Sequence, residues 1–307
     1  MSMFESDGWR LGIIQAPITQ VAHQQGLDDA DIHWINAPRP LCFLADPFGL
    51  WIDNYLYLFA EAYDYRTRMG RIVVYVLDAQ LNILETGTVL EEAWHLSYPV
   101  VFEQNGDIWM MPEGYKSGRL NLYRAIEFPW RWQRVEDFDF PTAAIDASLW
   151  RNHEGWWIFY TPPTPKEART SALMLAHAPS LHGPWRNVTD QPIRIDKSGA
   201  RMGGTPFIDG DRLVLPTQDC SQCYGGAITL LSTPLEHLER PQLEVHGTLT
   251  APASAGLWQD GLHTLSAVDD RFTLIDTNRM IRGSLHRIGL DIRRALGKAT
   301  RLGSLNG

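Results

Sequence analysis

The chain has 307 residues, a formal net charge of −9 and 44% hydrophobic residues, among them 12 Trp. The acidic balance speaks against nucleic acid as a partner, because a negative surface repels a polyanion. No apolar run approaches the roughly 20 residues that a membrane-spanning helix needs, and the acidic N-terminus does not resemble a signal peptide.

The three cysteines do not make a disulfide framework, because their number is odd. Cys220 and Cys223 form a single C-x2-C pair with no second pair of ligands, whereas structural zinc takes four ligands. The chain also has no D-x-D-x-D loop of the kind that binds calcium. We therefore predict no metal and no cofactor, and we expect a cytoplasmic protein.

Before the first repeat the chain contains one predicted strand. Residues 9–14, Trp-Arg-Leu-Gly-Ile-Ile, favour a strand, while residues 1–8 are expected to be loose. Residues 19–35 are polar and rich in Asp, Gln and His, which favours a loop or a short helix.

From Ala45 onward one pattern occurs five times: a β-rich run, a polar turn and a second β-rich run. Such pairs of runs are typical of β-hairpins. In each hairpin the last residue stands 15 positions after the first, and successive hairpins begin 52, 48, 57 and 58 residues apart. The first and last residues are Asp46 and Glu61, Tyr98 and Glu113, Asp146 and Thr161, Gly203 and Gln218, and Gly261 and Asp276.

The spacing leaves room for two further strands in each repeat. Candidates follow the hairpins at residues 71–77, 83–90, 119–125, 132–135, 171–178, 226–231 and 242–246. Equal hairpins at a period near that of propeller blades predict an all-β, five-bladed β-propeller, with residues 9–14 completing the fifth blade. We assign residues 1–279 to this domain, in which the two ends of every hairpin would meet at the central axis.

Residues 280–307 have a different character. Apolar residues recur there at steps of three and four, which predicts a C-terminal amphipathic helix: Ile281, Leu285, Ile288, Ile292 and Leu296. From Arg279 to Arg301 there are seven Lys or Arg and one acid, so the helix would have a basic face. Two interpretations stay open. The tail caps the propeller, or it contacts anionic lipid at the inner membrane surface as a peripheral segment.

The predicted axis gathers carboxylates. If the hairpin ends converge, one mouth of the channel holds Asp46, Glu61, Glu113, Asp146 and Asp276. Buried charges without partners cost several kcal/mol each, so this cluster indicates a function. Like charges raise one another's pKa and leave one acid protonated beside another that is ionised. Glycosidic-bond cleavage uses that division.

We predict Asp46, Glu113 and Asp146 as the catalytic residues, with Glu113 as the proton donor. The predicted substrate-binding residues are polar or aromatic side chains near the same mouth: Glu61, His95, Tyr98, Arg201, Gln218, Tyr224, His263 and Thr264. Structural alternatives remain for several of them. Asp46 could cap a turn before Pro47, and His263 could be a core residue. Glu61 could pair with Arg66, Arg68 or Arg71, and Asp276 with Arg279.

Two short motifs resemble the acid-bearing blade starts of five-bladed propeller glycosidases, the arabinanase/xylosidase group and the invertase-type β-fructosidases. These motifs are Ala-Asp46-Pro-Phe-Gly and Ile-Asp146-Ala-Ser. The resemblance implies that Asp46 is the base or nucleophile and that Asp146 tunes or stabilises. The acid of those families is a Glu that comes later in the chain than Glu113.

A second resemblance covers nearly the whole chain. It rests on Phe-Leu-Ala-Asp-Pro-Phe, His-Leu-Ser-Tyr-Pro-Val, Met-Pro-Glu-Gly, Arg-Met-Gly-Gly, Pro-Thr-Gln-Asp-Cys and Gly-Leu-His-Thr, in this order. Together they resemble the N-terminal propeller domain of plant-type glucosamine inositolphosphorylceramide transferases and its stand-alone bacterial relatives. The resemblance implies the propeller fold and a glycan or glycoconjugate as the partner. In the plant proteins the transferase chemistry is assigned to a separate C-terminal domain.

Three functional classes stay open. The first is a glycoside hydrolase-like enzyme that cleaves or transfers a glycosidic bond with a carboxylate pair in the central funnel. The second is a non-catalytic glycan-binding propeller in polysaccharide or glycolipid assembly. The third is a glycosyltransferase or transglycosidase at a membrane surface, which the basic tail would suit.

Overall fold

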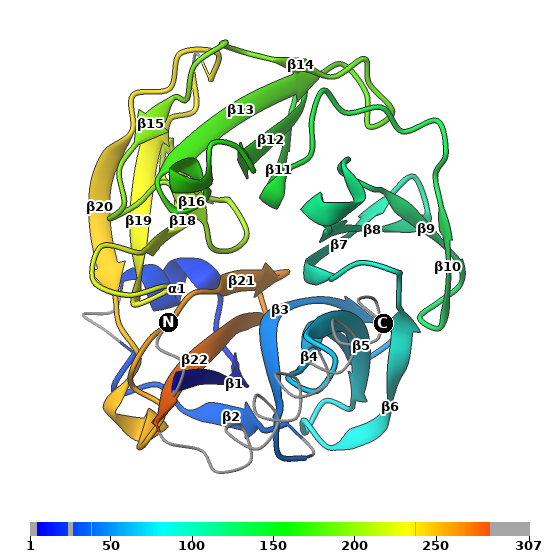
Figure 1. Cartoon of the computed structure of the whole chain (residues 1–307), viewed down its shortest axis with the longest axis vertical. Helices are drawn as coiled ribbons and strands as arrows, with labels where there is room; N and C mark the ends of the chain where they lie inside the picture. Colours follow the sequence, from blue (N-terminus) through cyan, green and yellow to red (C-terminus); the bar gives the residue numbers. More distant parts are fainter. Residues whose placement is uncertain (1–4, 24–26, 38, 237, 283–307) are drawn as a thin grey trace, which may run out of the picture.

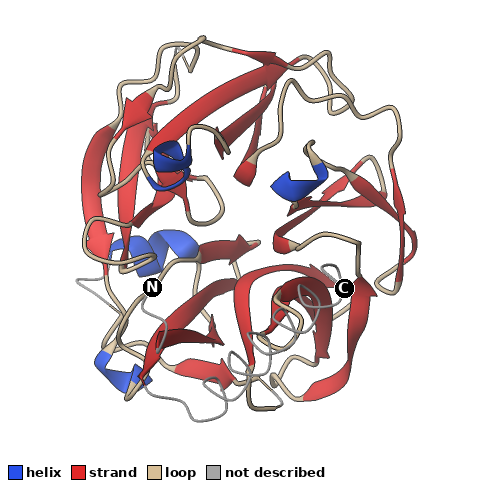
Figure 2. Cartoon of the chain, in the orientation of Figure 1, coloured by secondary structure: helices blue, strands red, loops and turns tan. Residues whose placement is uncertain are grey.

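Five antiparallel β-sheets stand around a central axis like the blades of a propeller (Figure 1). This computed structural model describes residues 5–23, 27–37, 39–236 and 238–282. Strands dominate the described part (Figure 2). The helical pieces there are α1 (Ile18–His23) and three short 3-10 turns at Tyr115–Ser117, Lys166–Thr170 and Ala253–Ala255. The predicted all-β, five-bladed propeller is confirmed.

The first four blades follow one another along the chain. Blade 1 consists of β3 (Cys42–Ile52), β4 (Tyr55–Asp64), β5 (Met69–Leu77) and β6 (Ile83–Leu90). Blade 2 consists of β7 (Ser97–Gln104), β8 (Asp107–Glu113), β9 (Tyr123–Glu127) and β10 (Arg131–Arg134). Blade 3 contains β11 (Ile145–Asn152), β12 (Gly155–Thr161), β13 (Ala172–Ala178), β14 (Arg186–Asn187) and β15 (Arg194–Ile195). Blade 4 contains β16 (Arg201–Met202), β17 (Phe207–Asp209), β18 (Arg212–Asp219), β19 (Ala227–Pro234) and β20 (Glu244–Leu249).

The fifth blade combines both ends of the chain. Its strands, in order, are β21 (Leu265–Val268), β22 (Phe272–Arg282), β1 (Glu5–Ile14) and β2 (Ile32–Ile35). Strand β1 pairs with β22 over its whole length, so the predicted closing strand is confirmed. It begins at Glu5, inside the segment expected to be loose. The segment 19–35 contains most of α1, as expected, and also β2, which we did not predict because it has only four residues.

Large apolar side chains fill the space between neighbouring blades. Trp109, Trp156 and Trp157 are buried, with 7%, 7% and 3% of their surface exposed. Trp51 is half-buried and packs against Phe272 from the fifth blade, with ring centroids 5.3 Å apart. Burying a large apolar side chain contributes about 1.5–3 kcal/mol. The faces of the sheets therefore hold the ring together.

Three hairpins begin with the same β-bulge. In the first, Ala45 pairs with Glu61 and the next pair is Phe48 with Phe59, so Asp46 and Pro47 lie outside the ladder. The register shifts in the same way at the starts of β7 and β11. The bulged residues Asp46, Tyr98 and Asp146 have φ angles of 53°, 46° and 46°, in the left-handed region. In these three hairpins the residue predicted to come first is the bulged residue. The residue just before it is the one that pairs with the neighbouring strand.

The predicted C-terminal helix falls mostly outside the described residues. Strand β22 continues to Arg282, past the predicted boundary at residue 279, and residues 283–307 are not described. The lipid and capping interpretations of the tail therefore stay predictions. Within the described ranges, the helices are too short and polar to cross a bilayer.

Tyr98 reaches across the axis and joins blades 2, 3 and 4. Its hydroxyl accepts a hydrogen bond from the Gly204 N–H at 2.6 Å and lies 2.8 Å from Ser148 Oγ. The Ser148 hydroxyl in turn donates to the Gly204 carbonyl, 2.8 Å away. Gly204 has a φ of +150°, and a Cβ there would lie 1.7 Å from the Leu265 carbonyl oxygen. Only glycine fits this crossing.

We expect Tyr98→Phe to lower the free energy of unfolding by about 1–3 kcal/mol, because the buried Gly204 N–H loses its acceptor. Denaturant unfolding followed by tryptophan fluorescence measures the change. The matched control is Tyr55→Phe, since Tyr55 is 39% exposed. Equal stability of the two variants would contradict the role given to the Tyr98 hydroxyl.

Candidate active site

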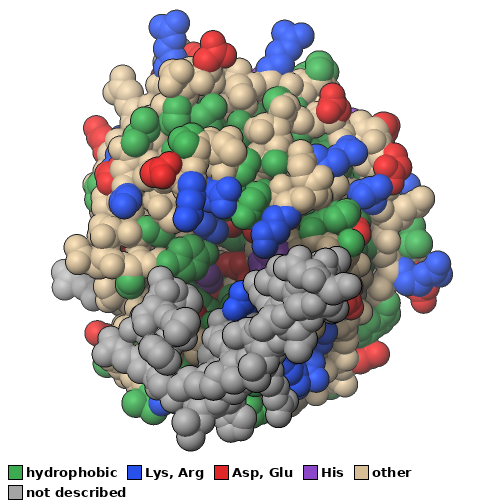
Figure 3. Space-filling model, in the orientation of Figure 1, with side chains coloured by type: hydrophobic (Ala, Val, Ile, Leu, Met, Phe, Trp, Pro, Cys, Tyr) green, Lys and Arg blue, Asp and Glu red, His purple; other side chains and the backbone are tan. Residues whose placement is uncertain are grey.

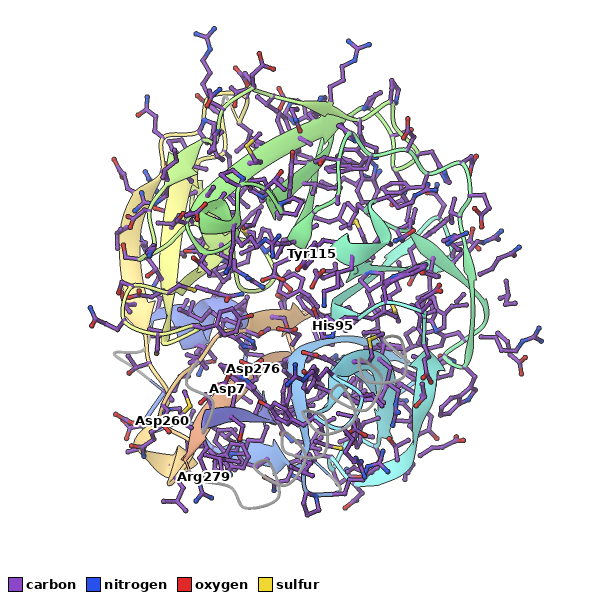
Figure 4. All side chains as sticks on the ribbon, viewed as in Figure 1. Asp7, His95, Tyr115, Asp260, Asp276 and Arg279 are labelled. Carbon is purple, nitrogen blue, oxygen red and sulfur yellow. The ribbon has the colours of Figure 1, made fainter. Side chains whose placement is uncertain are left out.

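Five carboxylates lie together at one mouth of the central channel. They are Asp46, Glu61, Glu113, Asp146 and Asp276, with 6%, 5%, 6%, 2% and 0% of their surface exposed. Acidic and histidine side chains are visible in a hollow near the centre of this face (Figure 3). His95, Tyr115 and Asp276 lie around the same centre in Figure 4, although His95 comes from the connection between β6 and β7, Tyr115 from the turn after β8 and Asp276 from β22. The ring of blades thus brings together acids that are far apart in the sequence.

Asp46 is held from both neighbouring blades. Its Oδ2 accepts the Tyr98 N–H at 3.2 Å, and its Oδ1 accepts the Thr264 hydroxyl at 3.2 Å. Its own N–H donates to Asp276 Oδ2 at 2.9 Å. Burial raises the pKa of Asp46 to about 6, although the neighbouring His263 lowers it. Asp46 is therefore mostly ionised at neutral pH.

His263 lies between two carboxylates. Nδ1 is 2.8 Å from Asp276, Nε2 is 3.5 Å from Asp46 Oδ1, and the ring stacks on Trp9 at a centroid distance of 3.8 Å. Burial opposes its charge, but Asp276 and Asp46 outweigh burial and raise its pKa to about 9. Ligand atoms of the three residues lie within 4.8 Å of one another, close enough for a metal ion. When His263 is protonated it has no lone pair for a metal, and the three groups then form an ion-paired cluster.

Asp146 forms a buried ion pair. Its Oδ2 accepts hydrogen bonds from Arg201 Nε at 2.5 Å and from Gln218 Nε2 at 2.8 Å. Arg201 also donates to the Arg169 carbonyl at 3.1 Å, and its guanidinium lies 5.1 Å from the centre of the Tyr224 ring. Asp146 thus has a cation and an amide donor on the same carboxylate oxygen, which is the geometry of a strong charge-assisted hydrogen bond.

Glu113 accepts hydrogen bonds from neutral donors, whereas Asp146 is bound by an arginine. Its Oε2 accepts the Ser97 hydroxyl at 3.0 Å, and its Oε1 accepts the Tyr115 N–H at 2.7 Å. Within the described ranges, no Arg or Lys forms an ion pair with it. Burial, followed by the charge of Asp146, raises the pKa of Glu113 to about 7. This acid can hold or release a proton near neutrality.

Glu61 lacks strong donors. Its Oε1 is buried and has no hydrogen-bond partner in the described part of the chain; the closest polar contact is His95 Nε2 at 3.5 Å. Arg66, one of the arginines considered as its partner, binds Asp64 instead. Burial raises the pKa of Glu61 well above its usual range. Arg279, considered as the partner of Asp276, lies away from it (Figure 4).

The remaining predicted binding residues divide by exposure. Tyr224 is 43% exposed at the mouth, edge-on to His263. Tyr98, Gln218 and Thr264 are fully buried, and the Tyr98 ring has no surface left for a sugar to stack on. Their contacts with a substrate stay predictions.

Two residues near the mouth were not predicted. Arg169 donates to the Tyr115 hydroxyl at 3.2 Å and lies over its ring, 5.0 Å from the centre. Both belong to short 3-10 turns between strands. The repeated hairpin pattern makes no prediction about such turns. The proximity of Tyr115 to Glu113 in the sequence was the one available signal.

Comparison with known proteins agrees with the resemblance to the glucosamine inositolphosphorylceramide transferases that the sequence motifs indicate. Residues 32–253 match the family described as Glucosamine inositolphosphorylceramide transferase 1, N-terminal. A transferase of that name from Oryza sativa subsp. indica is 41% identical over 195 residues, which is 62% of this chain and 26% of that protein. The Arabidopsis thaliana protein is 34% identical over 266 residues, 82% of this chain and 34% of its own length. The chain thus spans about a third or less of these relatives.

Solved structures share the fold. A GH43_1 enzyme from Xanthomonas citri has a TM-score of 0.53 at 15% identity, over 81% of this chain and 90% of that one. RS223-Beta-xylosidase has a TM-score of 0.55 at 10% identity, over 79% and 94%. The GH62 α-L-arabinofuranosidase domain of Coprinopsis cinerea also has a TM-score of 0.55 at 10% identity, over 79% and 93%. At these identities the likeness concerns the fold alone.

We expect Arg201→Ala to lower the free energy of unfolding by about 3–5 kcal/mol, because it leaves Asp146 buried without a cation. Denaturant unfolding at neutral pH measures the loss. Arg134→Ala is the control, since Arg134 pairs with Glu136 at the surface, where the side chains are 35% and 70% exposed. Similar losses in both variants would be inconsistent with a strong pair between Arg201 and Asp146.

The stability that His263 contributes depends on pH. Its pKa in the folded protein, about 9, is above that of an unfolded histidine, so its stabilising effect is complete below about 6.5 and disappears as the pH rises through about 9. We expect the stability difference between the wild type and His263→Gln to shrink by roughly 3 kcal/mol from neutral pH to above pH ~9. Denaturant titrations at several pH values test this. A constant difference would show that His263 is neutral in the fold.

Proposed function

We propose that this chain, which belongs to the glucosamine inositolphosphorylceramide transferase N-terminal family, cleaves or transfers a glycosidic bond of a glycan or glycoconjugate. The proposed reaction takes place at the carboxylate mouth. One observation carries the proposal: the acids of a single site have partners of different kinds. Asp46 and Asp146 lie beside cationic side chains, whereas Glu113 is bound by neutral donors.

In the proposed reaction Glu113 protonates the oxygen of the leaving group. A general acid works best when its pKa is close to the working pH, and the pKa of Glu113 is about 7. Asp46 is the ionised carboxylate that attacks the sugar carbon or activates the acceptor. The acceptor is water in hydrolysis and a hydroxyl group in transfer.

Asp146 has an indirect part in this scheme. Its negative charge, fixed by Arg201, raises the pKa of Glu113 and so helps that acid to keep its proton. This corresponds to the tuning role that the glycosidase resemblance implies for Asp146. The positive charge of Arg201 acts on Glu113 in the opposite sense and lowers its pKa, although burial and Asp146 outweigh it.

A second candidate function is glycan binding without turnover. It is favoured by the close ion pair between Arg201 and Asp146, since an acid that is held by a cation in this way serves structure and recognition as well as catalysis. Turnover measurements separate the two candidates.

We expect Glu113→Gln and Asp46→Asn each to lower turnover about 10²- to 10⁴-fold, because one removes the transferable proton and the other the ionised carboxylate. Release of the aryl group from aryl glycosides of xylose, arabinose and glucosamine, and transfer from glycolipids, measure the effect. Glu103→Gln is the control, since Glu103 is exposed at the far end of β7. The wild-type rate should rise as Asp46 ionises near pH 6 and fall as Glu113 deprotonates near pH 7.

Turnover that survives both substitutions would refute the assignment of these two residues. Glycan binding by the wild type without turnover of any of these compounds would favour the binding function.

A further inference from the structure

Glu61 differs from the other four acids in the hydrogen bonds that its carboxyl group receives. Each of the others accepts at least two donors, from side chains or from backbone N–H groups. Glu61 Oε1 is buried and has no hydrogen-bond partner among the residues that the structure describes, and 95% of the surface of the residue is buried. A buried carboxylate without donors is strongly disfavoured, whereas a buried carboxylic acid is tolerated.

His95 is oriented so that it faces Glu61 as a neutral ring. Its Nδ1 accepts the Gly70 N–H at 2.9 Å, so the proton of the neutral ring is on Nε2. Nε2 lies 3.5 Å from Glu61 Oε1. Burial, and then the charge of Lys116, lowers the pKa of His95 to about 4. His95 therefore supplies no positive charge that would ionise Glu61.

Acidic groups on four other strands act electrostatically on Glu61. Asp46 on β3, Glu113 on β8, Asp146 on β11 and Asp276 on β22 all act on it, and burial is the largest influence. Each of these influences raises the pKa of Glu61.

The backbone holds this pair of side chains closely. A Cβ at Gly70 would lie 2.6 Å from Glu61 Oε1, 2.8 Å from His95 Cε1 and 2.4 Å from the Leu96 carbonyl oxygen. Glycine at this position lets β5 lie against both side chains while its N–H fixes the imidazole tautomer. Glu61 and His95 therefore form one built unit at the wall of the mouth.

We propose that Glu61 binds the glycan as a neutral carboxylic acid, whose hydroxyl donates a hydrogen bond to an acceptor oxygen of the sugar, with the neutral ring of His95 beside Oε1. A carboxylate can only accept hydrogen bonds, whereas the neutral acid also donates one. A neutral Glu61 would favour ligands that place an oxygen acceptor near it. That oxygen can be neutral or negatively charged. The choice of a sugar as the ligand rests on the function proposed above.

Two substitutions at Glu61 separate a neutral donor from an ionised acceptor. Glu61→Gln keeps an uncharged group with an N–H donor, so we expect affinity for the bound aryl glycoside within about threefold of the wild type. Glu61→Ala removes the donor and should weaken binding about fivefold to thirtyfold. Calorimetry with the Glu113→Gln background, in which turnover is suppressed, measures both. If Glu61→Gln binds as weakly as Glu61→Ala, the proposal is wrong.

A measurement without any ligand tests the protonation state directly. Infrared difference spectra of the wild type against Glu61→Gln at neutral pH should contain the carbonyl stretch of a protonated carboxylic acid. A carboxylate band in its place overturns the proposal even if the enzyme is active. Conversely, turnover that does not depend on Glu113 or Asp46 would refute the proposed catalysis, while the infrared band and the Glu61 binding series would still support the neutral donor.

Discussion

The structure depends on one electrostatic constraint: five acids must be buried around a common axis without mutual repulsion that would open the ring. The protein meets it in two ways. Arg201 and the imidazolium of His263 place positive charge beside some of the acids. Glu61 and Glu113 have no such partner among the described residues and hold protons more strongly. The same division that makes burial tolerable underlies the proposed roles of Glu113 as acid and Asp46 as ionised carboxylate.

The repeated blades place equivalent positions at equivalent depths around the axis, and the residue at the bulge position differs from blade to blade. The β-bulge that opens blades 1, 2 and 3 holds its residue at a positive φ, which a non-glycine residue adopts only where the surroundings enforce it. An aspartate occupies the bulge in blades 1 and 3, and Tyr98 occupies it in blade 2. The tyrosine bridges the axis, while Asp46 and Asp146 line the mouth on its two sides.

The blades and the convergence of the acids were predictable because equal hairpins must place equivalent residues at equivalent depths. The contacts that assign roles were not. The stack of Trp9 on His263 joins the two ends of the chain, and the Glu61–His95 unit depends on the tautomer that Gly70 fixes. Such contacts arise from side-chain rotamers and from packing between blades, which leave no periodic signal in the sequence. Strand β2 was missed for a simpler reason, since four residues are too short to show a pattern.

The pairing of β1 with β22 sets the order of events during biosynthesis. The blades in between consist of consecutive strands and can form as the ribosome releases them. β1, in contrast, exposes an unpaired edge until the residues of β22 have left the exit tunnel, and such edges invite association with other nascent chains. Because His263 and Asp276 both belong to the last blade, Asp46 gains its cationic neighbour only when translation of the propeller is finished.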